Sequence, residues 1–159
     1  MTAEEVRKIV HQHFDAEARH DAPAAAATYA PQGYYHHVPL GLRLEGRDAV
    51  AAGYASSFAA FPDSEIVNDG EAVEGNTYVH WGRFRATVSG SWLGLPPTHR
   101  RLDLPFAAVI EVRDGRMIGE ALYYDLDTLC MQSGHTIEAV RSAADGIRRA
   151  AAAHAQPAA

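Results

Sequence analysis

Apolar side chains recur every three or four residues in the first part of the chain. Val6, Val10 and Phe14 fall on one helical face, and Thr2 with Glu5 forms a capping-box pattern at the start of this segment. We therefore predict an N-terminal helix. The same period predicts two further helices, over Ala24–Tyr29 and Asp48–Phe61.

The pattern changes to alternation after Ser64, which is typical of strands. The predicted strands are a short one at Tyr34–Val38 and four longer ones at Glu65–Val73, Tyr78–Trp92, Arg101–Val112 and Arg116–Tyr124. Asp114-Gly115 lies between the last two strands and is a strong hairpin signal. Helices followed by an antiparallel meander indicate an α+β fold rather than alternating βαβ units.

The C-terminal part is predicted as a separate feature. Residues 1–135 form the predicted domain, and residues 136–159 form a helix with an alanine-rich tail. The last ten residues, 150–159, are of low complexity, and we expect them to fray.

Composition narrows the class of protein. The chain has 159 residues, enough for one domain with a sizeable core, and its single cysteine, Cys130, excludes an intramolecular disulfide. The net charge of −6 argues against a nucleic-acid partner, because phosphate binding requires a clustered basic face. No apolar run is long enough for a membrane span, and the acidic N-terminus does not resemble a signal peptide, so we expect no membrane partner and a cytoplasmic location.

Several kinds of chemistry lack their usual motifs. No His-x-x-x-His or Cys-x-x-Cys pair suggests a metal site, and no nucleophile elbow, phosphate loop or dinucleotide fingerprint is present. Cys130 lies in an apolar helical stretch, where a thiol stays protonated and inert. We therefore predict no metal and no cofactor.

A set of short motifs, in a fixed order, carries a family resemblance. They are Gly46-Arg47-Asp48-Ala49-Val50, Phe61-Pro62-Asp63, Gly94-Leu95-Pro96-Pro97-Thr98, Asp114-Gly115-Arg116-Met117 and Tyr124-Asp125 followed by Gln132-Ser133-Gly134. Together they resemble the SnoaL-like polyketide or ester cyclase branch of the nuclear transport factor 2-like superfamily, over roughly residues 3 to 134. The resemblance implies a conical α+β barrel, in which a curved sheet wraps around helices and encloses an apolar pocket. It also implies a homodimer and an intramolecular aldol condensation without metal or cofactor.

The resemblance also locates the cyclase residues and shows that this chain departs from them. The position of the family's general-base aspartate, three residues before Asp125, is Leu122, and the position of its histidine is Ala108. Both aldol residues are therefore replaced. Further apolar candidates for the pocket wall, by residue type and strand or helix face, are Tyr34, Phe58, Trp81 and Phe106.

Other polar residues could supply acid/base chemistry. Glu120, Leu122 and Tyr124 share one strand face, which the resemblance makes the pocket face. In an apolar cavity Glu120 should have a raised pKa, as a general base requires, and Tyr124 could donate to an enolate oxygen. His36 and His37 point to opposite faces of a strand, so only one of them can assist as an acid.

Two functions of different class follow from these residues. The first is a cofactor-free acid/base enzyme of the cyclase or isomerase type, acting on a small apolar carbonyl compound. The alternative is a non-catalytic protein that binds a hydrophobic ligand, or a dimeric scaffold with a filled cavity. Convergence of Glu120 and an inward histidine on one cavity would favour the enzyme.

Overall fold

The computed structural model describes residues 1–155 of the chain, with side chains as far as Ala153. The helices are α1 (Ala3–Ala18), α2 (Ala22–Ala27), α3 (Arg47–Ala60), α4 (Leu126–Ser133) and α5 (Ile137–Ala155), with a single 3-10 turn at Val38–Leu40. The strands are β1 (Tyr29–His37), β2 (Leu42–Glu45), β3 (Glu65–Glu74), β4 (Thr77–Thr87), β5 (Arg101–Arg113) and β6 (Arg116–Tyr124). The predicted α+β class is confirmed.

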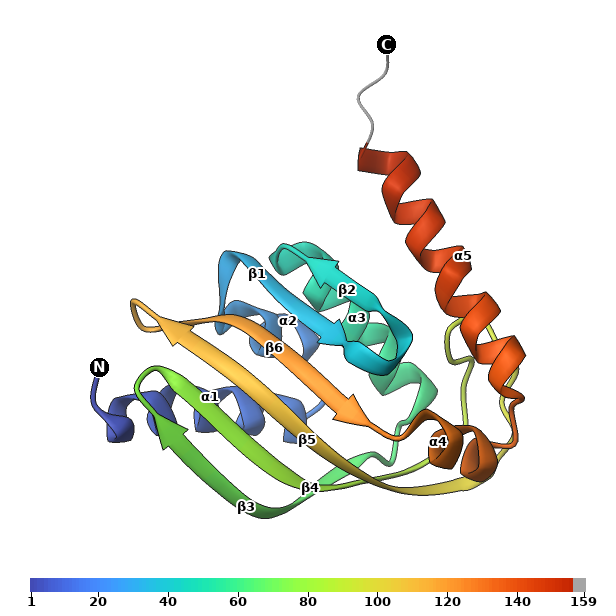
Figure 1. Cartoon of the computed structure of the whole chain (residues 1–159), viewed down its shortest axis with the longest axis horizontal. Helices are drawn as coiled ribbons and strands as arrows, with labels where there is room; N and C mark the ends of the chain where they lie inside the picture. The colour runs from blue at the N-terminus through green and yellow to red at the C-terminus, as the bar shows by residue number, and fades with distance from the viewer. Residues whose placement is uncertain (156–159) are drawn as a thin grey trace.

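The six strands form one curved sheet in the order β2-β1-β6-β5-β4-β3 (Figure 1). β3 to β6 form the predicted antiparallel meander, and Asp114 and Gly115 both have positive φ at its last turn. The sheet is not antiparallel throughout, because β1 pairs in parallel with β6. It is also not a closed barrel, since β2 and β3 remain as its two edges.

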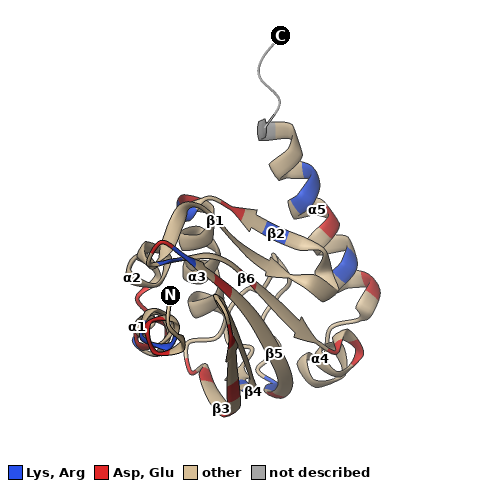
Figure 2. Cartoon of the chain, turned by 60° about the vertical axis from the view of Figure 1, so that its left-hand side comes forward, with Lys and Arg blue, Asp and Glu red and all other residues tan. Residues whose placement is uncertain are grey.

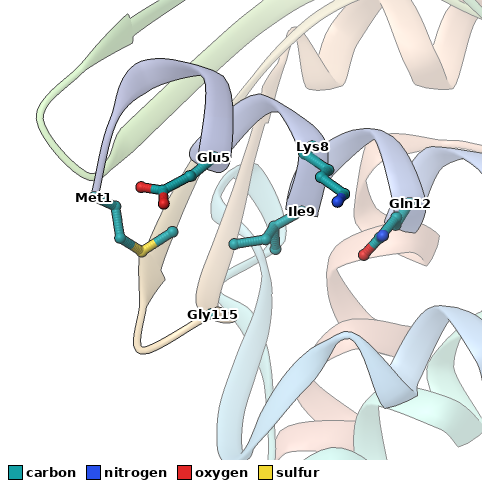
Figure 3. A pocket seen from close by; sticks show the side chains of 6 residues that line it. All are labelled: Met1, Glu5, Lys8, Ile9, Gln12 and Gly115. Atoms are coloured by element: carbon teal, nitrogen blue, oxygen red, sulfur yellow. The ribbon is translucent and has the colours of Figure 1, made fainter.

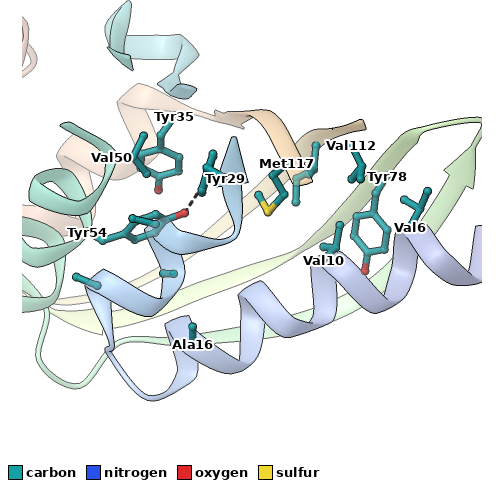
Figure 4. Packing of buried hydrophobic residues seen from close by; sticks show 14 residues of the cluster. Val6, Val10, Ala16, Tyr29, Tyr35, Val50, Tyr54, Tyr78, Val112 and Met117 are labelled. Carbon is teal, nitrogen blue, oxygen red and sulfur yellow. Dashed lines mark hydrogen bonds between the residues drawn. The ribbon is translucent and has the colours of Figure 1, made fainter. Parts of the chain in front are cut away.

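Helices α1, α2 and α3 lie on the concave side of the sheet (Figure 1). α1 begins with the predicted capping box between Thr2 and Glu5, and it buries Val6, Val10 and His13. Val6 and Val10 join tyrosines from β1 and α3 in one buried cluster (Figure 4). The helices and the sheet therefore hold this end of the molecule together through their apolar faces.

Some predicted boundaries are wrong. The alanine-rich helix begins at Ala22, because Asp21 caps it by accepting a hydrogen bond from the Ala24 N–H. β1 begins at Tyr29, well before the predicted strand at Tyr34–Val38, and a register shift absorbs the residues between Tyr29 and Tyr34. β4 ends at Thr87 rather than at residue 92, and β2 occupies a segment predicted as a loop.

The last helix, α5, packs through Val140 and Ala144 against a second buried cluster that includes residues of α4, β5 and the end of α3. Arg148 of this helix donates a hydrogen bond to the Leu40 carbonyl. The helix continues through residues 150–155, where fraying was predicted, and residues 156–159 of that prediction lie outside the described residues. No helix in residues 1–155 has the length and apolar character needed to cross a membrane.

Candidate active site

A large cavity lies between the concave face of the sheet and the helices. Its volume is about 870 Å³, within the range of small-molecule sites. Side chains from α1, from α3 and from each of the six strands reach its wall. Leu129 of α4 and Ile147 of α5 complete it. Most of this wall is apolar or aromatic, so the few polar groups in it define its chemistry.

The predicted site residues divide into two groups. Six of them line the cavity: Glu120, Tyr124, His37, Phe58, Phe106 and Leu122. Four others do not appear in its wall: His36, Tyr34, Trp81 and Ala108.

Strand alternation explains the excluded residues. Tyr35 and His37 of β1 face the cavity, so Tyr34 and His36 face the other side of the sheet, where the Arg43 guanidinium lies 3.5 Å from the centre of the Tyr34 ring. On β4, His80 faces inward and Trp81 outward, with 45% of Trp81 exposed. Tyr34 and Trp81 were therefore wrongly assigned to the pocket, and of the two candidate histidines it is His37, not His36, that faces the cavity.

Ala108 is fully buried. Its strand partners show where the two positions that resemble the cyclase residues lie relative to each other. Leu122 and His80 lie directly across from Ala108 on the two neighbouring strands, and His37 lies across from Leu122 on β1. The two positions that resemble the cyclase pair are thus apolar, and each has a histidine on its outer neighbour strand. The polar groups of the site come from adjacent positions.

Glu120 is the centre of a buried polar network. Only 3% of this residue is exposed, and its Oε2 accepts hydrogen bonds from the hydroxyls of Tyr29 (2.6 Å) and Tyr54 (3.1 Å). The two hydroxyls are 3.1 Å apart, and the dashed line in Figure 4 marks the hydrogen bond between them. Within residues 1–155, the hydrogen bonds to this carboxylate all reach Oε2, which leaves Oε1 available on the cavity side.

His13 of α1 lies behind this carboxylate. Its Nε2 is 3.0 Å from the Tyr54 hydroxyl oxygen and 3.6 Å from Glu120 Oε2. Its Nδ1 faces the Ala25 carbonyl and the oxygen of Thr28, whose own proton goes to that same carbonyl. Nδ1 must therefore carry a proton. Tyr54 has a single proton, and when that proton goes to Glu120, a proton on His13 Nε2 completes the hydrogen bond to the Tyr54 oxygen. In this arrangement His13 is an imidazolium.

The charges agree with this proton count. Burial alone would lower the pKa of His13, but Glu17, at 3.6 Å, and Glu120 raise it to about 10. Burial would likewise raise the pKa of Glu120, yet hydrogen bonding and attraction from His13, with Tyr29, hold it below its ordinary value. The sequence-based expectation of a raised pKa for Glu120 is therefore wrong, because it did not include the imidazolium.

The pKa of His13 predicts how stability depends on pH. A folded-state pKa of about 10, against about 6.5 when unfolded, means that the stabilisation is complete below pH 6.5 and is lost as pH rises towards 10. Between pH 7 and 8 the free energy of unfolding should fall by about 1 kcal/mol, because the histidines whose pKa is lowered are then almost neutral in both states. Urea unfolding at these two pH values measures the loss, and the window ends below the range in which Cys130, whose pKa is raised by burial, would add to it. Equal stability at the two values would contradict a charged His13.

Tyr35 is the nearest cavity-lining neighbour of Glu120 across the sheet. The two residues are register partners on β1 and β6, so their side chains lie side by side on the inner face. The Tyr35 ring stacks on Tyr54 with 4.9 Å between the ring centres. Burial first, and then Glu120, raises the pKa of Tyr35, so its hydroxyl remains a donor.

Tyr124 lies farther from Glu120 than the sequence argument assumed. Four residues of strand separate their Cα atoms by about 13 Å. The Tyr124 hydroxyl instead lies 3.2 Å from His37 Nδ1. Burial lowers the pKa of His37 to about 4, so this histidine is neutral near pH 7 and cannot act as the predicted cationic acid.

Sequence analysis missed five polar residues of the site: His13, Tyr29, Tyr35, Tyr54 and His80. The signal for two of them was present, because His13 falls on the apolar face of α1 and Tyr54 on that of α3. A polar residue on such a face needs a buried partner. Tyr29 was missed because the sequence pattern predicts it at the end of a helix. His80 was missed because the predicted pocket residue of its strand was Trp81, which faces the opposite side of the sheet.

The wall of the cavity is acidic where it is charged. Four carboxylate residues line it: Asp15, Glu17, Glu65 and Glu120. No lysine or arginine of the described chain lines it. The acidic segments of α1 and β3 lie at the same side of the molecule (Figure 2), and Glu65 has a distant ion pair with Arg85 at 3.8 Å. The cavity therefore disfavours anions.

Two other features carry no comparable chemistry. A smaller hollow of about 360 Å³ lies between the start of α1 and the β5–β6 turn, lined by Lys8, Glu5 and mostly non-titratable neighbours (Figure 3). Within residues 1–155, no group of three or more histidine, cysteine, aspartate or glutamate side chains is arranged to hold a metal ion.

A curved sheet that encloses an apolar cavity against helices is the architecture of a known protein family, as comparison of the chain with family models and solved structures shows. Residues 10–119 match the model of the SnoaL-like domain, and the chain belongs to this family. Among the similar solved structures, one is described as having a ketosteroid isomerase-like fold and another as a nuclear transport factor 2-like protein. No curated protein matches the chain.

Similar solved structures differ in the activities that their names give. A protein from Jannaschia sp. CCS1 named as a SnoaL-like polyketide cyclase is 24% identical, with a TM-score of 0.74 over 82% of this chain and 92% of that one. AclR from Streptomyces galilaeus, named as a hydroxylase, is 16% identical, with a TM-score of 0.70 over 84% and 98%. A protein with a ketosteroid isomerase-like fold from Catenulispora acidiphila is 19% identical, with a TM-score of 0.69 over 82% and 95%. These likenesses show the fold alone.

Proposed function

We propose that the chain is an acid/base enzyme whose substrate is a small, uncharged, apolar carbonyl compound. The observation that carries the proposal is the carboxylate of Glu120, ionised by a buried imidazolium, with one oxygen left on a cavity whose wall is mostly apolar. A carboxylate that faces an apolar ligand at this position can take a proton from it. The same cavity is lined by a second polar group, the neutral His37, so its wall is not purely apolar as expected for a binding protein.

The proposed step is proton transfer from a carbon beside the carbonyl. Glu120 Oε1 takes the proton, the C–H electron pair moves into the new C–C double bond, and the carbonyl oxygen becomes an enolate. The Tyr35 hydroxyl, next to Glu120 across the sheet, donates to that oxygen. Return of the proton to another carbon gives an isomer. Attack of the enolate carbon on a second carbonyl closes a ring instead, and the alkoxide formed from that carbonyl takes the proton back from Glu120.

The lowered pKa of Glu120 restricts the substrate further. A weaker base removes a proton at a useful rate only where the resulting anion is well stabilised. The proposal therefore favours a carbon activated twice, by two carbonyls or by a carbonyl and an aromatic ring. His37 and Tyr124, hydrogen-bonded to each other farther along the cavity, contact the remainder of the molecule.

Hydrogen–deuterium exchange tests the proposal without knowledge of the product. The probe is 2-tetralone, a bicyclic ketone whose C1 protons lie between a carbonyl and a ring. In deuterated buffer at pD 7, the wild-type protein should accelerate loss of the C1 proton signal beyond the buffer rate, as measured by NMR. Binding without acceleration would support the hydrophobic-ligand carrier instead, and absence of binding would support a scaffold.

Ligand charge provides a separate prediction. The carboxylates of the wall and the absence of lysine and arginine from it should make the cavity reject anions. We expect 2-acetylnaphthalene to raise the melting temperature in a thermal-shift assay and 2-naphthoate, of similar shape, to leave it unchanged. A larger shift with 2-naphthoate would contradict the proposed substrate class.

Pairing of two copies, which the family resemblance implies, remains a prediction. The outward side chains Trp81 and Tyr123, 45% and 48% exposed, are the aromatic positions on the outer face of the sheet that such pairing would cover.

A further inference from the structure

His80 has no partner for either ring nitrogen. Only 2% of the residue is exposed, and neither Nδ1 nor Nε2 makes a hydrogen bond within the described part of the chain. Leaving a buried polar group without a partner is destabilising. Proteins satisfy nearly all such groups, so an unpartnered histidine requires an explanation.

The surroundings of His80 are aromatic. The ring centre of Phe14 lies 4.7 Å away, that of Phe106 5.2 Å and that of Tyr78 5.9 Å. Phe14, Phe106 and His80 itself all line the cavity of Glu120. Phe14 and Phe106 are only partly buried, and one of these rings would have to turn before a ligand in the cavity reached the buried nitrogens of His80.

Burial keeps His80 neutral against the pull of the carboxylates that face it. Burial lowers its pKa, and the charge of His13 adds to this, against attraction from Glu120, Glu17 and Glu71. A neutral imidazole has one nitrogen that donates and one that accepts. Its complement is a hydroxyl group, which also donates and accepts.

We propose that His80 is a ligand-binding residue that hydrogen-bonds a hydroxyl group of the substrate. This inference rests on the proposed function, because it assigns the substrate of the same cavity. His80 and Glu120 lie on different strands, two strands apart in the sheet, so the hydroxyl lies on a different part of the substrate from the carbon that loses its proton. The substrate class becomes an uncharged hydroxylated carbonyl compound.

The first test uses the protein without ligand. Replacing His80 by leucine, of similar size, removes the unpartnered nitrogens, and the melting temperature should rise by about 2–6 °C. The matched control His99→Asn changes an exposed histidine and should leave the melting temperature unchanged. A fall in the His80→Leu variant would overturn the proposal, because it would give the ring a structural role.

The second test compares 2-tetralone with its 5-, 6- and 7-hydroxy derivatives. The wild-type protein should bind the best of the hydroxylated compounds about 2- to 10-fold more tightly than the parent, the gain expected from one hydrogen bond. His80→Leu should lose this preference and bind the parent as before, and His80→Gln should retain part of it. Equal preference in wild type and His80→Leu overturns the role of His80. No binding of any tetralone contradicts the proposed function itself, while the melting temperatures still decide whether the ring is structural.

Discussion

Replacing His13 by leucine is expected to lower the free energy of unfolding by about 3–5 kcal/mol. The substitution keeps an apolar side chain on the buried face of α1 but leaves the Glu120 carboxylate, only 3% exposed, without its cation. An unpaired charge in such surroundings is far more costly than a lost contact. Urea unfolding at pH 6.5 measures the change.

A double variant separates the charge effect from packing. Replacing both His13 and Glu120 by leucine removes the uncompensated charge, so most of the lost stability should return. If the double variant is instead less stable than His13→Leu by the full amount of a further core substitution, the two residues act independently, and the ion pair is not what stabilises this part of the fold.

Replacing Glu120 by glutamine should reduce the exchange of 2-tetralone by about 10²–10⁴-fold. Glutamine keeps the shape of the side chain and one oxygen to accept from Tyr29, but it cannot take a proton at neutral pH. NMR of the C1 protons in deuterated buffer gives the rate, and the affinity for 2-tetralone should change little.

The control for this prediction is Glu111→Gln. Glu111 carries the same functional group on β5, next to Gly119 of β6, but it is exposed outside the cavity. Its replacement should leave the exchange rate unchanged. Equal rates in wild type and Glu120→Gln would remove Glu120 from the role of base and leave the cavity as a binding site.

Much of the fold was predictable because it depends on local patterns. The period of α1, the alternation of β6 and the Asp114-Gly115 turn each record in the sequence which side of an element is buried. The parallel pairing of β1 with β6 could not be predicted in this way, because it joins distant segments and leaves no local signal. The choice between His36 and His37 depended on the same pairing and was therefore open.

The site was less predictable than the fold for a related reason. Alternation placed Glu120 on the inner face correctly, but the direction of its pKa depends on His13, which belongs to a helix at the other end of the chain. Tyr124 was chosen because it shares a face with Glu120, although distance along the strand separates them. Tyr35 is the neighbour of Glu120 across the parallel pair of β1 and β6, and it can be identified only when the register of these strands is known.

Whether Glu120 is an ionised base on the cavity depends on the charge of His13, because an imidazolium is what holds that carboxylate ionised. The measurement is ¹⁵N NMR of histidine-labelled protein at pH 8, with the His13 signals assigned by their absence from a His13 variant. We expect His13, one of the nine histidines of the chain, to have protons on both ring nitrogens at this pH. A His13 ring with one protonated nitrogen at pH 8 would contradict the ion pair and, with it, the proposed base.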